Sequence, residues 1–419
     1  MKKRLWSLIV LVVVFLISSV LTSMMAKAQE MVWNTNPTSL PSGIAYHASV
    51  VHNNKIYVIG GTSPISISAR VFFADISSDG TISSWTETTS LPEPRGGITN
   101  AVTMWNNFIY AAGGNSASSP GERNDVWYAE IKADGTLGNW MTTTPMPWRA
   151  RQHFAVMWDG WIYIGGGTDG YGWKDYVAYA KINPDGSLGN WNYTTSLPLA
   201  YGAMGALASN GKIYLIGGTS TWGGPGLSHK EVYYASINPD GSLGTWLATT
   251  PLPGERENSG AVLFGKDIYV TGGQKTPENI VYGTVYRSTI NMDGSIGTWQ
   301  SLQNLPEPRE GHSSVIFGNR IYTLGGTYKG YKDTIYYSPL PIQSPFWAQW
   351  WFWTIVTLGI IAIAFALTTI YYHKQVSVPK EIKATSIKQS SKECKVCPNC
   401  GANLPADSKF CGKCGASLQ

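Results

Sequence analysis

Apolar residues follow two kinds of pattern along the 419-residue chain. Two long apolar runs lie near its ends, and short apolar runs recur at regular spacing between them. The recurring element has the form IYxxGG, and its copies begin at Ile56, Ile109, Ile162, Ile213, Ile268 and Ile321. Short apolar runs bounded by glycine are typical of β-strands. Their repetition at a nearly fixed period predicts one structural unit that is repeated six times.

Each unit contains patterns for four strands. An apolar run such as HASVVHNN is followed by KIYVIGG, and a variable loop leads to a third run such as EVYYASI. A nearly constant segment of the type DGSLGNW follows, in which Asp-Gly predicts a tight turn into a fourth strand that begins near the Trp. Four antiparallel strands in a unit of this length predict a propeller blade.

The ends of the repeat region predict a closed ring. The sixth unit runs through TIYYSPL and has no Trp segment after it, whereas Trp33 and Leu40-Pro41 stand alone before the first unit. We therefore expect an N-terminal strand to complete the sixth blade, which leaves no open sheet edge. The predicted fold is all-β, a six-bladed β-propeller over residues 29–345.

The repeat resembles the kelch family of β-propellers over roughly residues 31–340. The resemblance rests on the double glycine, a later Tyr, the Trp, the Leu-Pro pair and a following Arg, as at Arg95, Arg256 and Arg309. It implies loops that meet on one face around a central channel. The kelch resemblance also raises two enzyme classes as candidates, namely copper-radical oxidases and sialic-acid mutarotases. The oxidases need a Cys joined to a Tyr, and the region before the second long apolar run has no Cys, so we exclude that chemistry.

The two long apolar runs predict export and a membrane anchor. Residues 1–28 have a basic start, an apolar run and Ala26-Lys27-Ala28, the pattern of a cleaved signal peptide; an uncleaved anchor is the alternative. Residues 346–372 include an uncharged run that begins at Trp350, is long enough for a transmembrane helix and has aromatic residues at both ends. The lysines that follow make a buried core helix the less favoured reading.

Lysine-rich residues 373–393 predict a cytoplasmic linker by the positive-inside rule. Charge is segregated in the same sense, because the middle of the chain is mildly acidic and both ends are basic. The sequence therefore predicts a single-pass cell-membrane protein whose propeller is extracytoplasmic and whose C-terminus is cytoplasmic.

All five cysteines follow the second apolar run. Cys397, Cys400, Cys411 and Cys414 form two Cys-x2-Cys pairs within residues 394–419, the spacing of a zinc ribbon with a structural Zn²⁺. We expect Cys394 to be spare. Acidic residues dilute the nearby lysines, so we expect this module to contact a cytoplasmic protein rather than nucleic acid.

Composition agrees with a strand-rich fold, since the chain has 46 Gly, 23 Tyr and 18 Trp but only 14% charged residues. Loops that vary between repeats are where recognition usually lies. We expect aromatic, basic and histidine side chains of these loops to bind a glycan or protein ligand. The candidates are Arg95, Trp148, Arg149, Arg151, Tyr171, Trp173, Trp222, His229, Arg256, Arg309 and His312.

Two further interpretations stay open. One is that many of these rings bind nothing and pack between neighbouring loops. His47, His153 and His312 each stand nine residues before an IY pair, and this repetition favours structural hydrogen bonding over a metal site. The alternative function is an extracytoplasmic sugar-modifying enzyme of the mutarotase or epimerase type, with acid–base groups drawn from the arginines and from Glu255, Glu257, Glu307 and Glu310.

Overall fold

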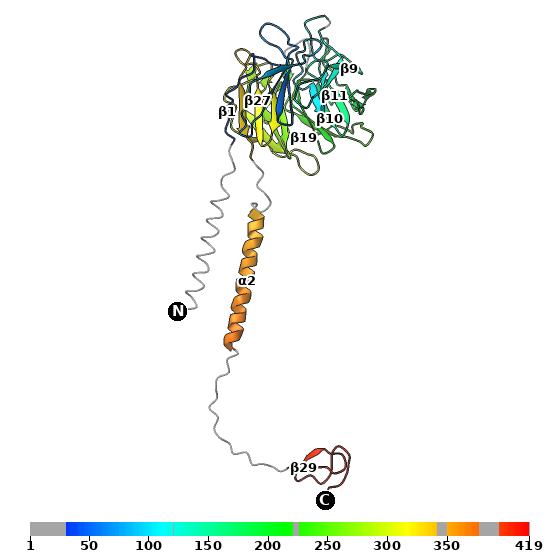
Figure 1. The fold of residues 1–419 in the computed structure, drawn as a ribbon, viewed down its shortest axis with the longest axis vertical. Coiled ribbons are helices and arrows are strands. Elements are labelled where there is room, and N and C mark those ends of the chain that lie inside the picture. The colour runs from blue at the N-terminus through cyan, green and yellow to red at the C-terminus, as the bar shows by residue number, and fades with distance from the viewer. Residues whose placement is uncertain (1–30, 120, 221–225, 342–349, 377–393, 419) are drawn as a thin grey trace, which may run out of the picture. The chain divides into compact units, whose positions relative to one another are not determined.

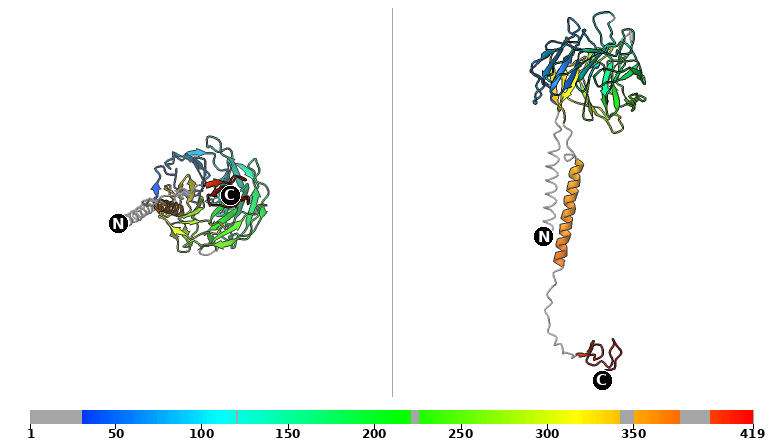
Figure 2. Two further views of the ribbon diagram at one scale, coloured as in Figure 1. Left: turned by 90° about the horizontal axis from the view of Figure 1, so that it is seen from below. Right: turned by 45° about the vertical axis from the view of Figure 1, so that its right-hand side comes forward.

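The computed structural model describes residues 31–119, 121–220, 226–341, 350–376 and 394–418. The predicted signal peptide, Trp222 and most of the predicted linker lie outside these residues. The chain divides into two units, residues 1–343 and 344–419. The first is an all-β propeller (Figure 1), and its ring of blades is seen end-on in Figure 2.

Six four-stranded antiparallel sheets form the blades, which confirms the predicted number. Blades 1 to 3 are β2 (Ala48–His52), β3 (Lys55–Ile59), β4 (Val71–Asp75), β5 (Thr86–Thr88); β6 (Val102–Trp105), β7 (Phe108–Ala112), β8 (Val126–Glu130), β9 (Met141–Thr143); and β10 (Phe154–Trp158), β11 (Trp161–Gly165), β12 (Val177–Lys181), β13 (Asn192–Tyr193).

Blades 4 and 5 have the same order and carry a small extra hairpin each. They are β14 (Gly205–Ser209), β15 (Lys212–Ile216), β18 (Val232–Ser236), β19 (Leu247–Thr249), with hairpin β16 (Thr219–Ser220) and β17 (Leu227–Ser228); and β20 (Gly260–Phe264), β21 (Asp267–Thr271), β24 (Val285–Thr289), β25 (Gln300–Ser301), with hairpin β22 (Gln274–Lys275) and β23 (Ile280–Val281).

Blade 6 joins the two ends of the repeat region. Its strands are β26 (Ser313–Phe317), β27 (Arg320–Leu324), β28 (Ile335–Pro339) and β1 (Asn34–Thr35). Asn34 pairs with Tyr337 and Thr35 with Tyr336, and the indole N–H of Trp33 donates to the carbonyl O of Gln303 at 3.0 Å. The N-terminal strand therefore closes the ring, as the sequence predicted.

Strand position explains the apolar patterns. The first strands of neighbouring blades contact one another and so surround the central channel. The second strands are buried along almost their whole length because each lies between two neighbouring blades, as in β3 (Lys55–Ile59), and strands buried on both faces need continuous apolar runs. The short fourth strands are mostly exposed at the outer edge, as in β5 (Thr86–Thr88).

The double glycine ends each second strand where there is no room for a side chain. Gly60 and Gly61 have φ values of 59° and 100°, which only glycine adopts readily. A Cβ at Gly60 would lie 2.6 Å from the carbonyl O of Arg95, and one at Gly61 would lie 2.6 Å from the Cβ of His47. The glycines thus let the chain turn away against the next loop.

The Asp-Gly-Trp segment links each blade to its neighbour. In blade 2 the Asp134 carboxylate accepts hydrogen bonds from the backbone N–H and the hydroxyl of Thr136, which fixes the turn. The Tyr57 hydroxyl of blade 1 donates to the carbonyl O of Gly135 at 2.8 Å, and the Trp140 indole donates to the carbonyl O of Thr89 at 3.0 Å. This confirms that the turn is structural.

The second unit contains helix α2 (Trp350–Val376) and a small β-hairpin of β29 (Cys394–Val396) and β30 (Asn403–Pro405). Within α2 the 20 residues from Phe352 to Tyr371 are long and apolar enough to cross a membrane, by length and composition.

Candidate functional site

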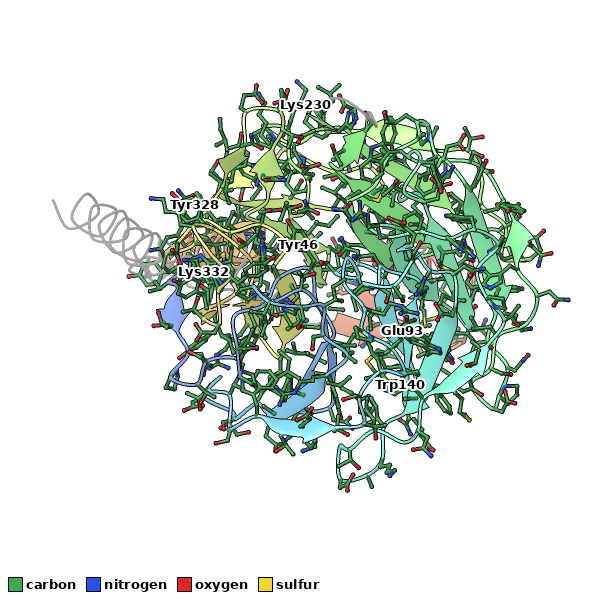
Figure 3. All side chains as sticks on the ribbon, turned by 90° about the horizontal axis from the view of Figure 1, so that it is seen from above. Tyr46, Glu93, Trp140, Lys230, Tyr328 and Lys332 are labelled. Carbon is green, nitrogen blue, oxygen red and sulfur yellow. The ribbon has the colours of Figure 1, made fainter. Side chains whose placement is uncertain are left out.

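Two faces of the propeller differ in kind. The loops that join second to third strands and fourth strands to the next blade lie on one face, which we call the variable-loop face. The short turns that join first to second strands and third to fourth strands lie on the other, the turn face. Figure 3 shows the propeller along its axis, with Tyr46 near the middle and Lys230 at the rim.

Three of the predicted binding residues are buried arginines, and the structure corrects their expected role. Arg95, Arg256 and Arg309 are at most 1% exposed. The Arg95 side chain donates to the carbonyl O of Gly113 and pairs with Glu93 and Asp125.

The other two arginines have the same position in their blades. Arg256 donates to the carbonyl O of Gly272 and Arg309 to that of Gly325. Each guanidinium group therefore binds the carbonyl O of the first glycine in the double glycine of its own blade. A guanidinium buried among its own backbone partners cannot contact a ligand in this structure.

The histidines at the starts of the first strands are also internal. His312 and His47 are buried and share hydrogen bonds with the hydroxyls of Thr271 and Ser313 at 3.0 and 2.9 Å. Burial lowers the pKa of both to about 3, so they are neutral at physiological pH. The structure therefore supports the structural reading and corrects the expectation that His312 binds ligand. His153 is equally buried, but neither ring nitrogen has a hydrogen-bond partner among the described residues.

Trp148 is a second correction, because its ring packs inside an aromatic cluster. It is buried, stacks on Tyr193 with ring centroids 6.1 Å apart, and meets Tyr176 edge-on. Tyr193 and Tyr176 themselves are exposed. The surface-accessible rings here are therefore two tyrosines that the sequence did not single out.

The remaining candidates lie at or near the surface of the variable-loop face. Tyr171 is 88% exposed, at the tip of a loop in which the Asp169 carboxylate accepts hydrogen bonds from the N–H groups of Tyr171 and Gly172. Trp173 is half-buried, and its ring lies so close to Gly202 that a Cβ there would come within 2.5 Å of it.

The polar candidates of this face differ in their partners. Arg149 is exposed. Arg151 is half-buried and pairs with Glu122 at 3.3 Å. His229 is half-buried too, with its Nε2 2.7 Å from the Ser220 hydroxyl. The loops thus present charged and aromatic groups on a framework of ion pairs and turns.

A ring of six residues surrounds the channel on this face. Each stands directly before or near a first strand and has a positive φ between 53° and 61°; they are Tyr46, Gly97, Gln152, Ala203, Asn258 and Gly311. Backbone hydrogen bonds run from each blade to the next around the whole ring. We call these residues the mouth ring.

Polar side chains of the mouth ring meet across blades. The Tyr46 hydroxyl of blade 1 donates to Oε1 of Glu310, before blade 6, at 2.7 Å. The Gln152 amide donates to Asn258 Oδ1 at 3.3 Å, which spans from blade 3 to blade 5. Glu257, next to Asn258, accepts a hydrogen bond from the Gln274 amide at 2.9 Å.

Burial dominates the electrostatics of the ring. Glu310 is 7% exposed, and burial, with a contribution from the nearby Glu257 charge, raises the pKa of its carboxyl to about 7, although the hydrogen bonds from Tyr46 and Asn258 act in the opposite direction. Burial and the Glu310 carboxylate raise the pKa of Tyr46 far above its usual value, so the Tyr46 phenol remains a neutral donor.

The C-terminal module brings four thiols together. The ligand atoms of Cys397, Cys400, Cys411 and Cys414 all lie within 4.8 Å of one another, and the closest pairs are 3.5 and 3.7 Å apart. Four thiolates at the usual Zn–S distance are about 3.8 Å apart in a tetrahedron. The cluster therefore fits a zinc ion with a complete set of protein ligands, which leaves no open position for catalysis.

The fold and the metal site define a class of protein: a six-bladed β-propeller that resembles kelch-repeat domains, with a C-terminal module that resembles a zinc ribbon. A family model described as the KLHDC2/KLHL20/DRC7 Kelch-repeats domain matches residues 19–186, and a zinc-ribbon domain model matches residues 396–418. A kelch propeller is usually a protein-binding scaffold.

Curated relatives match the propeller. Mouse Kelch-like protein 23 is 26% identical over 265 residues, which cover 63% of this chain and 42% of that protein. Kelch-like protein terF of Aspergillus terreus is 28% identical over 212 residues, covering 48% of this chain and 44% of that protein. The chain thus spans about two fifths of the length of these relatives.

A solved structure described as "Structure of YjhT" aligns with a TM-score of 0.58 at 16% identity. It covers 74% of this chain and 98% of that one. At this identity the similarity concerns the fold alone.

Proposed function

We propose that this chain is a single-span membrane protein whose propeller lies outside the cytoplasm and binds a protein or glycan ligand through its variable-loop face. The zinc ribbon then lies in the cytoplasm, where it contacts a protein partner. The observation that carries the proposal is the contrast between the two faces. One carries constant Asp-Gly turns, and the other carries loops of differing length with exposed aromatic and charged side chains.

The ends of the propeller support this assignment. Leu340 N–H donates to the carbonyl O of Asn319, in the turn between β26 and β27, so the chain leaves the propeller at the turn face. The predicted span begins at Trp350, a few residues further on. The chain therefore leads to the predicted span from the turn face and not from the variable-loop face.

Binding can be tested with the purified full chain in detergent micelles. Glycan arrays and crosslinking on cells would be run with the native protein and with Tyr171→Ala and Trp173→Ala. Met292→Ala is a matched control, since Met292 is fully exposed on the turn face. We expect the loop variants, and not the control, to lose binding. Equal loss with Met292→Ala would contradict the assignment of the face.

Topology has a separate test, because no residue before Cys394 is a cysteine. A membrane-impermeant maleimide should label a Met292→Cys variant on intact cells and leave the native chain unlabelled until the cells are permeabilised. Labelling of the native chain on intact cells would place the zinc ribbon outside and refute the proposed orientation.

One observation favours a second candidate, an extracytoplasmic sugar-modifying enzyme. Glu310 at the channel mouth has a pKa near neutrality, which suits a general acid or base. Turnover of an aldose or amino sugar, followed by NMR of its anomeric protons, should then vanish in Glu310→Gln. Unchanged rates of sugar interconversion with and without the protein would leave binding as the function.

A further inference from the structure

The channel mouth concentrates negative charge on one side of the ring. The residue before each mouth-ring position bonds to the adjacent loop, and around the blades these residues are Ala45, Gly96, Arg151, Gly202, Glu257 and Glu310. The two carboxylates thus occupy equivalent places in neighbouring blades 5 and 6. The only cation of the set, Arg151, stands in blade 3, opposite blade 6, and is paired with Glu122.

Neutral groups make all the hydrogen bonds found to these two carboxylates. Glu310 has the Tyr46 hydroxyl and the Asn258 side chain as partners, and Glu257 has the Gln274 amide. Among the described residues neither carboxylate forms an ion pair. Oε2 of Glu310 is buried and has no hydrogen-bond partner there. Elsewhere on this face carboxylates such as Glu93 and Glu307 are bound by arginine or lysine.

A buried carboxylate without a cation is costly, so it takes up either a proton or a positive partner. The mouth offers acceptors in the right number for a positive partner: the free oxygen of Glu310, the carboxylate of Glu257 and the amide oxygen of Gln152. Tyr46, Gln152 and Gln274 are half-buried and form the solvent side of the cluster. A positively charged nitrogen donates two or three hydrogen bonds and would satisfy this set.

We propose that the channel mouth is a subsite for the basic side chain of a protein ligand, in which Glu310 and Glu257 bind its positively charged nitrogen. This inference deepens the proposed function and rests on it, because it names the group that the variable-loop face recognises.

Binding of such a group should depend on pH, because it competes with the proton on Glu310. The titratable groups that act on this carboxyl are Tyr46 and Glu257, and Tyr331 in turn acts on Tyr46. The buried histidines His47 and His312 stay neutral throughout the range. The ionised fraction of a group with a pKa of about 7 changes about thirtyfold between about pH 8.5 and about pH 5.5. Affinity should therefore rise with pH.

The test uses the full chain in detergent micelles and saturation-transfer NMR. The probes are the peptide amides acetyl-Gly-Lys-Gly and acetyl-Gly-Arg-Gly, and the norleucine peptide of the same length is the neutral control. We expect binding of a basic peptide at about pH 8.5, an affinity lower by about thirtyfold at about pH 5.5, and no binding of the norleucine peptide.

Variants separate the mouth from the rest of the face. Glu310→Gln is isosteric and keeps the bond from Tyr46, and it should abolish binding. Tyr46→Phe keeps the charge and should bind, as should Glu307→Gln, a matched control whose carboxylate already has Lys332 as a partner.

Three results would overturn the inference: no binding of either basic peptide, equal binding of the norleucine peptide, or unchanged binding by Glu310→Gln. Glycan or protein binding that survives in Glu310→Gln and is lost in Tyr171→Ala would preserve the proposed function while refuting this subsite.

Discussion

Replacing Glu310 by glutamine should remove a loss of folding stability that the propeller otherwise shows as pH rises. In the folded chain the pKa of Glu310 lies at about 7, against an ordinary value of 4.5. Between these two values the folded state keeps a proton that the unfolded state has released, so the stability contributed by this group is complete below pH 4.5 and is lost as pH rises to about 7. A shift of this size corresponds to about 3 kcal/mol.

The assay is urea unfolding followed by tryptophan fluorescence, since most of the 18 tryptophans belong to the propeller. The native chain, Glu310→Gln and Glu307→Gln would each be measured from about pH 5 to about pH 8.5. Glutamine mimics the protonated acid and still accepts the Tyr46 hydrogen bond. The free energy of unfolding of Glu310→Gln, relative to that of the native chain, should therefore increase by about 3 kcal/mol as pH rises from about 5 and level off above about pH 7.

Glu307→Gln should change stability by less than about 1 kcal/mol at every pH, because a partly exposed ion pair contributes little. The reasoning is refuted if the difference between Glu310→Gln and the native chain is constant with pH, or if Glu307→Gln reproduces the same rise.

Three further predictions concern acid, closure and metal. Burial lowers the pKa of His153 from 6.5 to about 4, so the stability that the neutral imidazole contributes is lost as pH falls from 6.5 to about 4. The free energy of unfolding of His153→Leu should therefore depend less on pH in this range than that of the native chain. Identical acid-unfolding curves by circular dichroism would contradict this. Trp33→Ala, which removes a buried ring directly before the strand that closes blade 6, should cost about 3–5 kcal/mol, seen as a lower melting temperature. A loss under about 1 kcal/mol would mean that closure contributes little. Cys397→Ser should abolish stoichiometric zinc, measured by elemental analysis, while Lys395→Ala should retain it; retained zinc in Cys397→Ser would disprove the four-thiolate site.

The repeat itself explains why the fold could be predicted in such detail. Six glycine pairs fixed the ends of the second strands, and the isolated Trp33 before the first copy indicated that the chain closes on itself. The same reasoning misplaced Arg95, Arg256 and Arg309. Because they recur at one place in the repeat, their recurrence was a signal for a structural role, namely bonding to the carbonyl of a glycine in the same blade.

The channel mouth was beyond what spacing alone could predict. Tyr46 and Glu310 are 264 residues apart and meet only because the ring closes between blades 6 and 1. A signal did exist, since the residues at and directly before the mouth-ring position differ in type from blade to blade. Variation at one position of a repeat identifies a surface free to specialise, but the sequence does not show that two such positions touch.

Closure of the ring has a consequence for how the molecule is made. Strand β1 is among the first parts of the propeller to leave the ribosome, yet its partner β28 is among the last, since Asn34 pairs with Tyr337. At ordinary rates of synthesis, about 300 residues take tens of seconds. During that time blade 1 has no sixth blade beside it, and the first strand must wait unpaired. Any factor that helps this protein to mature should therefore act on an incomplete ring, before its two ends have met.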